Sequence, residues 1–194
     1  MADKTWEIRF RDLKLVDNGD GTYSLAVSGQ SALVAGENHI GAVGGHTTIA
    51  TATPVVSTSP SYSANDQVGG LLAFTGAARV AGGSGVIHSV TITDKAKQDA
   101  TLDLYLFDSN PTSTTFTDNA ALTINAADLI KSIGVIRVST YQDVATNSVG
   151  GTTSTGVPFK LVSGTTLYGA LVTRGTPTYA STSDLQVRLG ILQD

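Results

Sequence analysis

Short runs in which apolar and polar residues alternate recur along the chain, and turn-forming residues interrupt them. The clearest run is Thr101–Phe107, where Leu102, Leu104 and Leu106 fall on one face. A period of two residues is typical of a strand with one buried face, whereas a helix would show a period of about 3.6. Asp108–Pro111 then ends the run with residues that favour turns. This pattern predicts an all-β fold.

Comparable runs follow one another from residue 61 to the end of the sequence. The predicted strands are 70–75, 86–93, 101–107, 132–139, 156–162, 166–173 and 184–192. Strands with this spacing indicate a β-sandwich or jelly roll. The long loops over 108–121 and 140–156 favour Greek-key crossings over a simple meander. Only 125–131 looks helical, and Asn125 could cap its single turn.

The composition supports a folded domain rich in strands and turns. Hydrophobic residues make up 41% of the chain and charged residues 14%, against a usual charged share of about 25%. The chain can therefore bury a core. Thr is abundant and favours strands because its β-branch fits a pleated surface, while the 21 Gly residues favour turns.

The N-terminal region predicts a β-hairpin. An alternating run up to Val16 changes parity near Arg11, as a β-bulge would require. The Asn/Asp/Gly cluster of Asp17–Gly21 separates this run from a second one, Thr22–Val27. A calcium loop of the EF-hand type would need oxygen ligands where Gly residues stand and a Glu where Ser28 stands, so we interpret the cluster as a turn.

The chain is therefore expected to have three parts. Residues 1–35 form a β-hairpin arm, residues 36–60 form an extended Gly/Thr-rich linker, and residues 61–194 form the β-sandwich. No hydrophobic period persists over residues 28–60, and about thirty structureless residues are too many for a loop inside a compact domain. We expect this stretch to lie along a partner or along neighbouring copies of the chain.

Charge and residue usage argue against several classes of protein. The net charge is −4 and no basic run occurs, which argues against a nucleic-acid partner. Cys is absent, so disulfides, thiolate metal sites and cysteine catalysis are excluded. No apolar stretch is long enough for a transmembrane helix, and the first residues lack the order of a signal peptide. We expect synthesis in the cytosol.

The three histidines do not predict a metal site. His39 and His46 lie in the Gly-rich stretch, which lacks a scaffold to bring three or four ligands together, although symmetric copies could do so at a three-fold axis. His88 lies within a predicted strand and is expected on its polar side.

The acidic and Gly-rich segments do not predict an active site either. Asp94, Asp99, Asp103 and Asp108 bracket two strands; paired acids can hydrolyse glycosides, but acids at strand ends are usually turn formers. The Gly-rich stretches 82–85 and 150–153 lack the ending of a phosphate-binding loop, and no nucleophile elbow has a supporting His. We predict no catalytic residue, no cofactor and no metal.

Three segments resemble structural proteins of tailed-bacteriophage virions. They are the hairpin stretch 17–27 and the later stretches 107–122 and 158–172. The resemblance implies a virion component such as a capsid decoration or cement protein. Proteins of that class often form trimers on the outer shell and clamp adjacent major capsid subunits. Such a protein would be found on the capsid surface after synthesis in the host cytoplasm.

Our leading hypothesis is thus a non-enzymatic decoration protein that binds the major capsid protein, or another virion protein, and stabilises the phage head. Its predicted partners include further copies of itself, with a trimer favoured, but neither nucleic acid nor membrane. The predicted anchoring residues of the arm are Trp6, Ile8, Phe10, Leu13, Leu15 and Tyr23.

Two other functions compete with this hypothesis. The chain could be a receptor- or glycan-binding protein of a tail or head fibre, since jelly rolls carry such sites in their loops. That function would need exposed aromatic residues, and the candidates in long loops are Phe116, Tyr141 and Tyr179. A glycan hydrolase would rest only on the scattered carboxylates.

Overall fold

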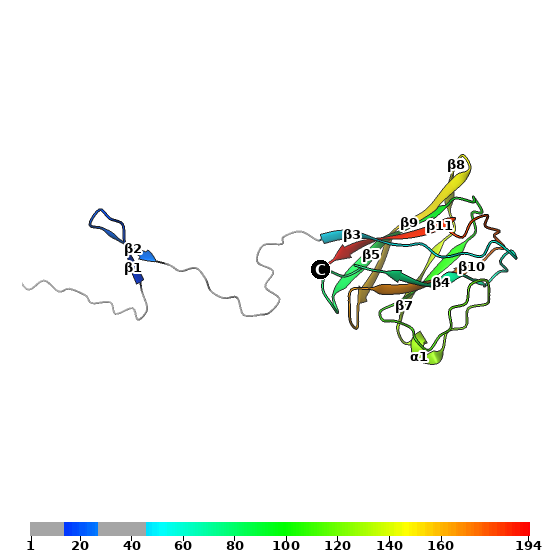
Figure 1. Ribbon diagram of the computed structural model, residues 1–194, viewed down its shortest axis with the longest axis horizontal. Helices are drawn as coiled ribbons and strands as arrows, with labels where there is room; N and C mark the ends of the chain where they lie inside the picture. Colours follow the sequence, from blue (N-terminus) through cyan, green and yellow to red (C-terminus); the bar gives the residue numbers. More distant parts are fainter. Residues whose placement is uncertain (1–13, 27–45) are drawn as a thin grey trace, which may run out of the picture. The chain divides into compact units, whose positions relative to one another are not determined.

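A computed structural model describes residues 14–26 and 46–194 of the chain (Figure 1). The chain divides into two compact units, Met1–Val43 and Gly44–Asp194. In the described part of the first unit, β1 (Lys14–Asp17) pairs antiparallel with β2 (Tyr23–Ala26), and Asp17 stands opposite Tyr23. The predicted β-hairpin is therefore present around the Asn/Asp/Gly turn.

The turn of this hairpin is held by its own polar residues. The backbone N–H of Asn18 donates to the Thr22 carbonyl at 3.0 Å, and the Thr22 N–H donates to the Asp20 carboxylate at 2.9 Å. The Thr22 hydroxyl and N–H together lower the pKa of Asp20. Gly19 and Gly21 have φ of 78° and 84°, a region that favours glycine.

The second unit is a sandwich of two antiparallel sheets. The five-stranded sheet has the order β3-β11-β5-β9-β8 and the four-stranded sheet the order β4-β10-β6-β7. The strands are β3 (His46–Ala52), β4 (Gln67–Phe74), β5 (Ser84–Asp94), β6 (Leu102–Phe107), β7 (Ser132–Val138), β8 (Tyr141–Val144), β9 (Asn147–Lys160), β10 (Leu167–Thr173) and β11 (Leu185–Gln193). The all-β, β-sandwich prediction is confirmed.

Pairing in the sandwich is nested along the sequence. The first long strand, β3, pairs with the last, β11; β4 pairs with β10; β5 pairs with β9; and β6 pairs with β7. A long antiparallel ribbon folded around a core would produce this nesting. The β-sandwich is thus established, and the predicted jelly-roll topology with Greek-key crossings stays a prediction.

The core lies between the two sheets and follows the alternation seen in the sequence. Leu102, Leu104 and Leu106 of β6 are fully buried. From the facing sheet, β11 directs Leu185, Val187, Leu189 and Ile191 inward. The side chains that pack between sheets are those that a period of two places on one face.

One segment of the predicted linker belongs to the sandwich instead. β3 pairs with β11 from His46 to Ala52, and Ala50, Ala52 and Val56 are buried in the core. The prediction of a linker that extends to residue 60 is therefore wrong. The buried positions of β3 are Ala, which is too small to give a visible hydrophobic period, so pairing with β11 rather than local pattern decides this strand.

The predicted loop 140–156 is also largely strand. β8 and the first half of β9 form a hairpin within it, in which Tyr141 stands opposite Gly150. A Cβ on Gly150 would lie 2.5 Å from the Tyr141 ring. Glycine is thus required at this position because the Tyr141 ring of β8 packs directly against the backbone of β9. In the sequence alone, the same glycine indicates a turn.

Residues 108–131, here called the 108–131 loop, cover the outer face of the four-stranded sheet. They include α1 (Ala126–Leu129), capped by the Asn125 side chain as predicted. The backbone of Gln67 in β4 exchanges hydrogen bonds with Ala120 and Asn119, and Phe116 packs edge-to-face on Phe107 of β6. Figure 1 shows α1 on this side of the sandwich. Outward-facing residues of this sheet, including Gln67 and Asp103, are therefore buried.

Candidate functional site

The predicted anchoring residues of the arm fall mostly outside the described residues. Trp6, Ile8, Phe10 and Leu13 lie there, while Leu15 and Tyr23 belong to β1 and β2. Their role as anchors stays a prediction.

The histidines are separate from one another where the structure describes them. His39 lies outside the described residues. His46 begins β3, and its Nδ1 lies 3.0 Å from Oε1 of Gln193. His88 is exposed at an irregularity of β5, on the polar side as predicted. Within residues 14–26 and 46–194, no group of three or more His, Asp or Glu side chains could hold a metal ion.

The carboxylates suggested for glycoside hydrolysis instead close turns. Asp94, buried at the end of β5, accepts hydrogen bonds from the backbone N–H groups of Ala96, Gln98 and Asp99 at 2.9, 2.9 and 3.1 Å. Burial raises the pKa of Asp94, although these three N–H groups oppose the shift. Asp99 is exposed, and Asp108 accepts a hydrogen bond from the Ser109 hydroxyl at 2.8 Å. These contacts are typical of turn-forming residues.

Asp103 has a different environment, because two arginines share its carboxylate. It lies buried on the outer face of β6. Nε and Nη2 of Arg137 in β7 donate to its two oxygens at 2.7 and 2.9 Å, and Nε of Arg174 donates at 2.7 Å. The Arg137 hydrogen bond lowers the pKa of Asp103 most, and Arg174 lowers it further against the opposing effect of burial.

Arg174 follows β10 and is held by further contacts. Its Nη1 donates to the Asn65 side-chain oxygen, and its Nη2 donates to the Tyr105 hydroxyl at 3.1 Å. The Arg174 side chain is 31% exposed. It lines a cleft of about 310 Å³, here called the Arg174 cleft. The lining residues are Asn65, Tyr105, Leu122, Ile124, Val172 and Arg174.

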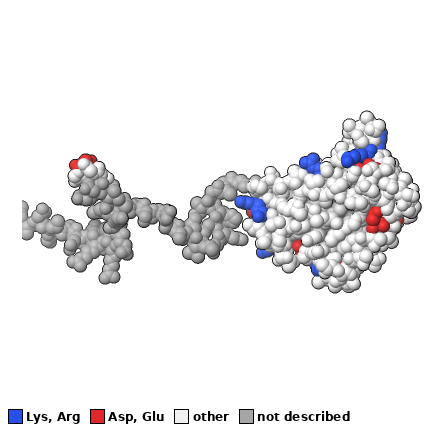
Figure 2. Space-filling model, in the orientation of Figure 1, with Lys and Arg blue, Asp and Glu red and all other residues white. Residues whose placement is uncertain are grey.

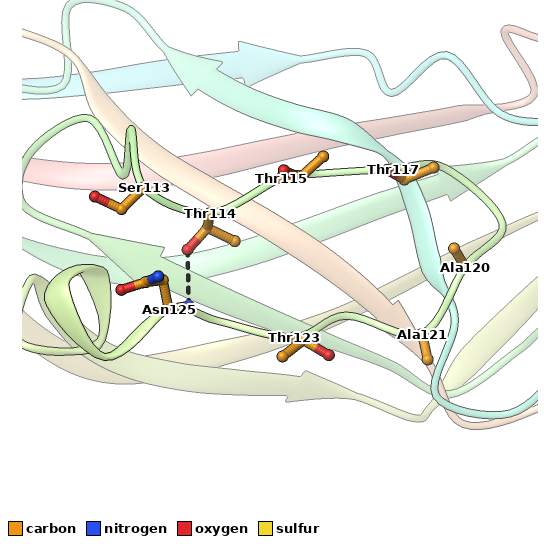
Figure 3. Close-up of a pocket in the computed structure, with 8 residues that line it drawn as sticks. All are labelled: Ser113, Thr114, Thr115, Thr117, Ala120, Ala121, Thr123 and Asn125. Atoms are coloured by element: carbon orange, nitrogen blue, oxygen red, sulfur yellow. Dashed lines mark hydrogen bonds between the residues drawn. The ribbon is translucent and has the colours of Figure 1, made fainter.

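A second concavity lies within the 108–131 loop and is lined mainly by hydroxyl and amide groups. We call this depression of about 330 Å³ the hydroxyl hollow. Figure 3 shows its lining and the hydrogen bond from the Asn125 N–H to the Thr114 hydroxyl, 3.0 Å long. The lining residues are Ser113, Thr114, Thr115, Thr117, Ala120, Ala121, Thr123 and Asn125.

The two concavities share one extended segment of the 108–131 loop. Thr123 and Asn125 line the hydroxyl hollow, whereas Leu122 and Ile124 line the Arg174 cleft. Alternate residues of an extended backbone point to opposite sides, which explains this division. The segment therefore separates a concavity lined mainly by hydroxyl and amide groups from one whose lining is mixed apolar and polar and includes a cation.

The aromatic residues suggested for glycan binding are not free on loop surfaces. Tyr179 is 1% exposed and packs edge-to-face on Tyr62, with ring centroids 5.7 Å apart. The prediction of Tyr179 as an exposed loop residue is therefore wrong, because its loop folds back over the end of the sandwich. Tyr141 donates its hydroxyl to the Ala100 carbonyl at 2.9 Å, and Phe116 is half-buried against Phe107.

Among residues 46–194, the outer face of the five-stranded sheet is exposed and almost free of charge. The register aligns outward-facing residues in rows across β3, β11, β5 and β9. One row contains Thr47, Leu192, Val86 and Pro158; the next contains Ile49, Gly190, Ser89 and Thr153; the next contains Thr51, Arg188, Thr91 and Gly151; and the last contains Gln186, Thr93 and Val149. Among these residues, Arg188 alone is charged. Lys160 and Asp194 lie beyond the Leu192 row.

Charged side chains are sparse elsewhere on the sandwich as well. Figure 2 shows few, scattered Lys, Arg, Asp and Glu side chains on the visible face of the second unit. Ile49 on the uncovered face is 55% exposed and Leu192 is 42% exposed. We call this face the uncharged face, because Arg188 is the one charged residue in its rows. Its other side chains are mostly hydroxyl-bearing, small or apolar.

Sequence reasoning did not find the arginine cluster or the uncharged face. Arg137 and Arg174 lie 34 and 71 positions from Asp103 in the sequence, so no local motif connects them. Only the placement of Asp103 between two buried leucines of a strand could have indicated a partner for it.

No helix among the described residues has the length and apolar character needed to cross a membrane. Neither the models of protein families nor the curated proteins nor the solved structures contain a match to this chain.

Proposed function

We propose that this chain is a non-enzymatic structural protein of a tailed-bacteriophage particle, which decorates the head by binding the major capsid protein and stabilises the shell. The observation that carries the proposal is the uncharged face of the five-stranded sheet. The resemblance of segments 17–27, 107–122 and 158–172 to virion proteins supplies the class of partner.

The chemistry of the uncharged face suits protein contact. Depletion of charge is the compositional mark of the centre of protein interfaces. Desolvating hydroxyl and apolar groups costs much less than desolvating charges. Ile49 and Leu192 supply apolar side chains, and Arg188 is the one charge that a carboxylate of the partner would have to match.

The size of this face implies a second point of attachment. Strands about 4.8 Å apart, each contributing about seven residues at about 3.4 Å, give a flat area of roughly 450 Å² for the four strands β3, β11, β5 and β9. A stable interface usually covers about 800 Å² per partner. The N-terminal hairpin, with the anchors predicted around it, would supply the remainder by adding a strand or apolar side chains to a neighbour.

Use of the described acids and arginines also supports a structural role. Asp94 and Asp184 accept backbone N–H groups within their own turns, and Asp118 accepts the N–H of Gly69 in β4. Asp103 forms ion pairs with Arg137 of β7 and with Arg174 after β10, and Asp128 pairs with Lys131 three residues later in the chain. Each of these carboxylates already binds hydrogen-bond donors or cations of the same chain. These contacts hold the loops and strands in place.

The proposal is tested by reconstitution on phage heads that lack the protein. Full-length protein should decorate these heads in regular, symmetric positions visible by electron cryomicroscopy. Deletion of residues 1–35 should abolish binding while the circular dichroism of the sandwich persists. Ile49→Asp should weaken binding at least tenfold, or about 1.4 kcal/mol. Val162→Asp, at a loop position 70% exposed, is the matched control.

Two outcomes would contradict the proposal. One is a particle image that places the chain on the tail, and the other is unchanged decoration by both the deletion variant and Ile49→Asp. We further expect a homo-oligomer, with a trimer favoured, and light scattering of the free protein measures this directly.

The second candidate function is a receptor- or glycan-binding protein of a tail or head fibre. The observation that favours it is the pair of concavities on the 108–131 loop, because ligand sites on sandwiches commonly lie in loops. Binding of the isolated protein to host-cell surface glycans, together with a tail location in the particle, would favour this function over decoration.

A further inference from the structure

We propose that the Arg174 cleft binds the carboxylate of an acidic sugar unit, such as a uronic or sialic acid. This inference goes beyond the structural role proposed above and does not depend on it. It rests on the charge of the arginine cluster, on the free donors of Arg174 and on the lining of the cleft.

The charge of the cluster favours an anion. Arg137 and Arg174 contribute two positive charges and Asp103 one negative charge, so the three side chains together carry one net positive charge. Asp66, which follows Asn65 of the cleft lining, accepts the backbone N–H of Ser63 at 2.7 Å, and among the described residues the ion pairs of Arg137 and Arg174 are both with Asp103. A monovalent anion in the cleft would therefore balance the cluster.

The donors of Arg174 match a carboxylate. A guanidinium has five N–H donors in a fixed plane. Asp103, Asn65 and Tyr105 each take one of them, through Nε, Nη1 and Nη2 respectively. Two donors remain, one on each terminal nitrogen, and a carboxylate offers two oxygens with matching spacing. Because three partners hold the guanidinium, little side-chain entropy is lost when a ligand binds.

The walls of the cleft suit a sugar ring more than a bare anion. Leu122, Ile124 and Val172 provide apolar contacts, and Tyr105 presents its hydroxyl, which accepts a hydrogen bond from Arg174. The cleft volume of about 310 Å³ is near the lower end of ligand sites, which typically span about 300–1,000 Å³. It therefore fits a monosaccharide unit rather than a larger ligand.

The hydroxyl hollow provides a place for the neighbouring units of a glycan. It lies on the other side of the segment that contains Leu122 and Ile124, and its lining has hydroxyl and amide groups but no charge. Such groups hydrogen-bond sugar hydroxyls and do not discriminate by charge. A peptide carboxylate would use the Arg174 cleft but would not need this second set of donors.

The test uses the full-length protein and saturation-transfer NMR with glucuronate and N-acetylneuraminate as probes. Both acids should bind with Kd values in the millimolar range, and their uncharged methyl esters should bind at least fivefold more weakly. Ile124→Glu introduces a carboxylate into the cleft wall without removing any contact of Arg174, and it should weaken binding at least tenfold. Thr117→Ala, outside the Arg174 cleft, is the control variant and should leave glucuronate binding within twofold.

Arg174→Lys tests the fork of donors in a second way. It keeps the charge but loses the paired N–H groups, so binding should fall at least fivefold while the circular dichroism spectrum is unchanged. If Arg174→Lys fails to fold, Ile124→Glu carries the test alone.

Three results would overturn the inference. Equal binding of acid and methyl ester would remove the role of the carboxylate. Binding unaffected by Ile124→Glu would place the ligand elsewhere. Acetate or N-acetylglutamate amide binding as tightly as glucuronate would show that the cleft recognises a carboxylate without a sugar.

Discussion

The Tyr62 hydroxyl donates a 2.6 Å hydrogen bond to the carboxylate of Asp118, and this contact connects the segment before β4 to the 108–131 loop. The same carboxylate accepts the backbone N–H of Gly69 at 2.6 Å, and the Tyr62 oxygen accepts the N–H of Ser57 at 2.8 Å. The 108–131 loop, which lines the hydroxyl hollow and part of the Arg174 cleft, is thus fastened to the sandwich by this small network. Burial and the Asp118 contact raise the pKa of Tyr62.

Tyr62→Phe should lower the free energy of unfolding by about 1–3 kcal/mol, because the Ser57 N–H and one Asp118 oxygen lose a buried partner. Tyr179→Phe is the matched control. Its ring packs against Tyr62, but among the described residues its buried hydroxyl has no hydrogen-bond partner. Removing that hydroxyl should change stability by less than about 0.5 kcal/mol or increase it. Urea titrations of both variants measure the difference, and equal losses would contradict this account.

Asp103→Asn should destabilise the protein by about 1–3 kcal/mol at pH 7, because the variant loses charge-assisted hydrogen bonds from two arginines. The folded state depresses the pKa of Asp103. Its contribution is therefore complete above the unfolded pKa of about 3.9 and disappears as the pH falls through the lower folded pKa. Urea titrations from pH 7 to pH 3 should show a constant difference from the wild type down to about pH 5, followed by a decrease. A difference that grew on acidification would refute the assignment.

Asp94 should show the opposite pH dependence. Burial raises its pKa in the folded state, so ionisation of Asp94 opposes folding as the pH rises from the unfolded pKa of about 3.9 through the higher folded pKa. Asp94→Asn removes this ionisation but also loses at least one of the three backbone contacts, because the side-chain NH2 cannot accept an N–H. The stability of the variant relative to the wild type should therefore improve as the pH rises above the unfolded pKa of about 3.9 and become constant once Asp94 is ionised in the folded wild type. A flat profile in the same urea series would show that burial does not perturb this carboxylate.

Gly150→Ala should destabilise the sandwich by about 1–3 kcal/mol through overpacking. The new Cβ would lie 2.5 Å from the Tyr141 ring, which must then move and release its hydrogen bond to Ala100. Gly70→Ala is the control, because a Cβ there meets no atom within 4 Å. It should stay within about 0.5 kcal/mol of the wild type. Thermal unfolding monitored by circular dichroism compares the two, and equal melting temperatures would exclude the close approach.

Prediction from the sequence succeeded where a strand buries large side chains on one face. The strand that contains Leu102, Leu104 and Leu106 could be predicted because each of these side chains is buried in the core. The short helix could be predicted from Asn125 because a cap is a local interaction. It failed for β3, whose buried positions are Ala50 and Ala52, and for Gly150, where a glycine serves a strand rather than a turn.

The sequence by itself determined the all-β class, the hairpin turn at Asp17–Gly21 and most strands of the sandwich, because these follow from local alternation and turn chemistry. Only the tertiary structure decided that β3 joins β11, that Tyr179 is buried and that Arg137 and Arg174 meet at Asp103. The physical reason is that these features depend on contacts between residues far apart in the chain. Burial and charge pairing are set by such neighbours, and a local pattern contains no information about them.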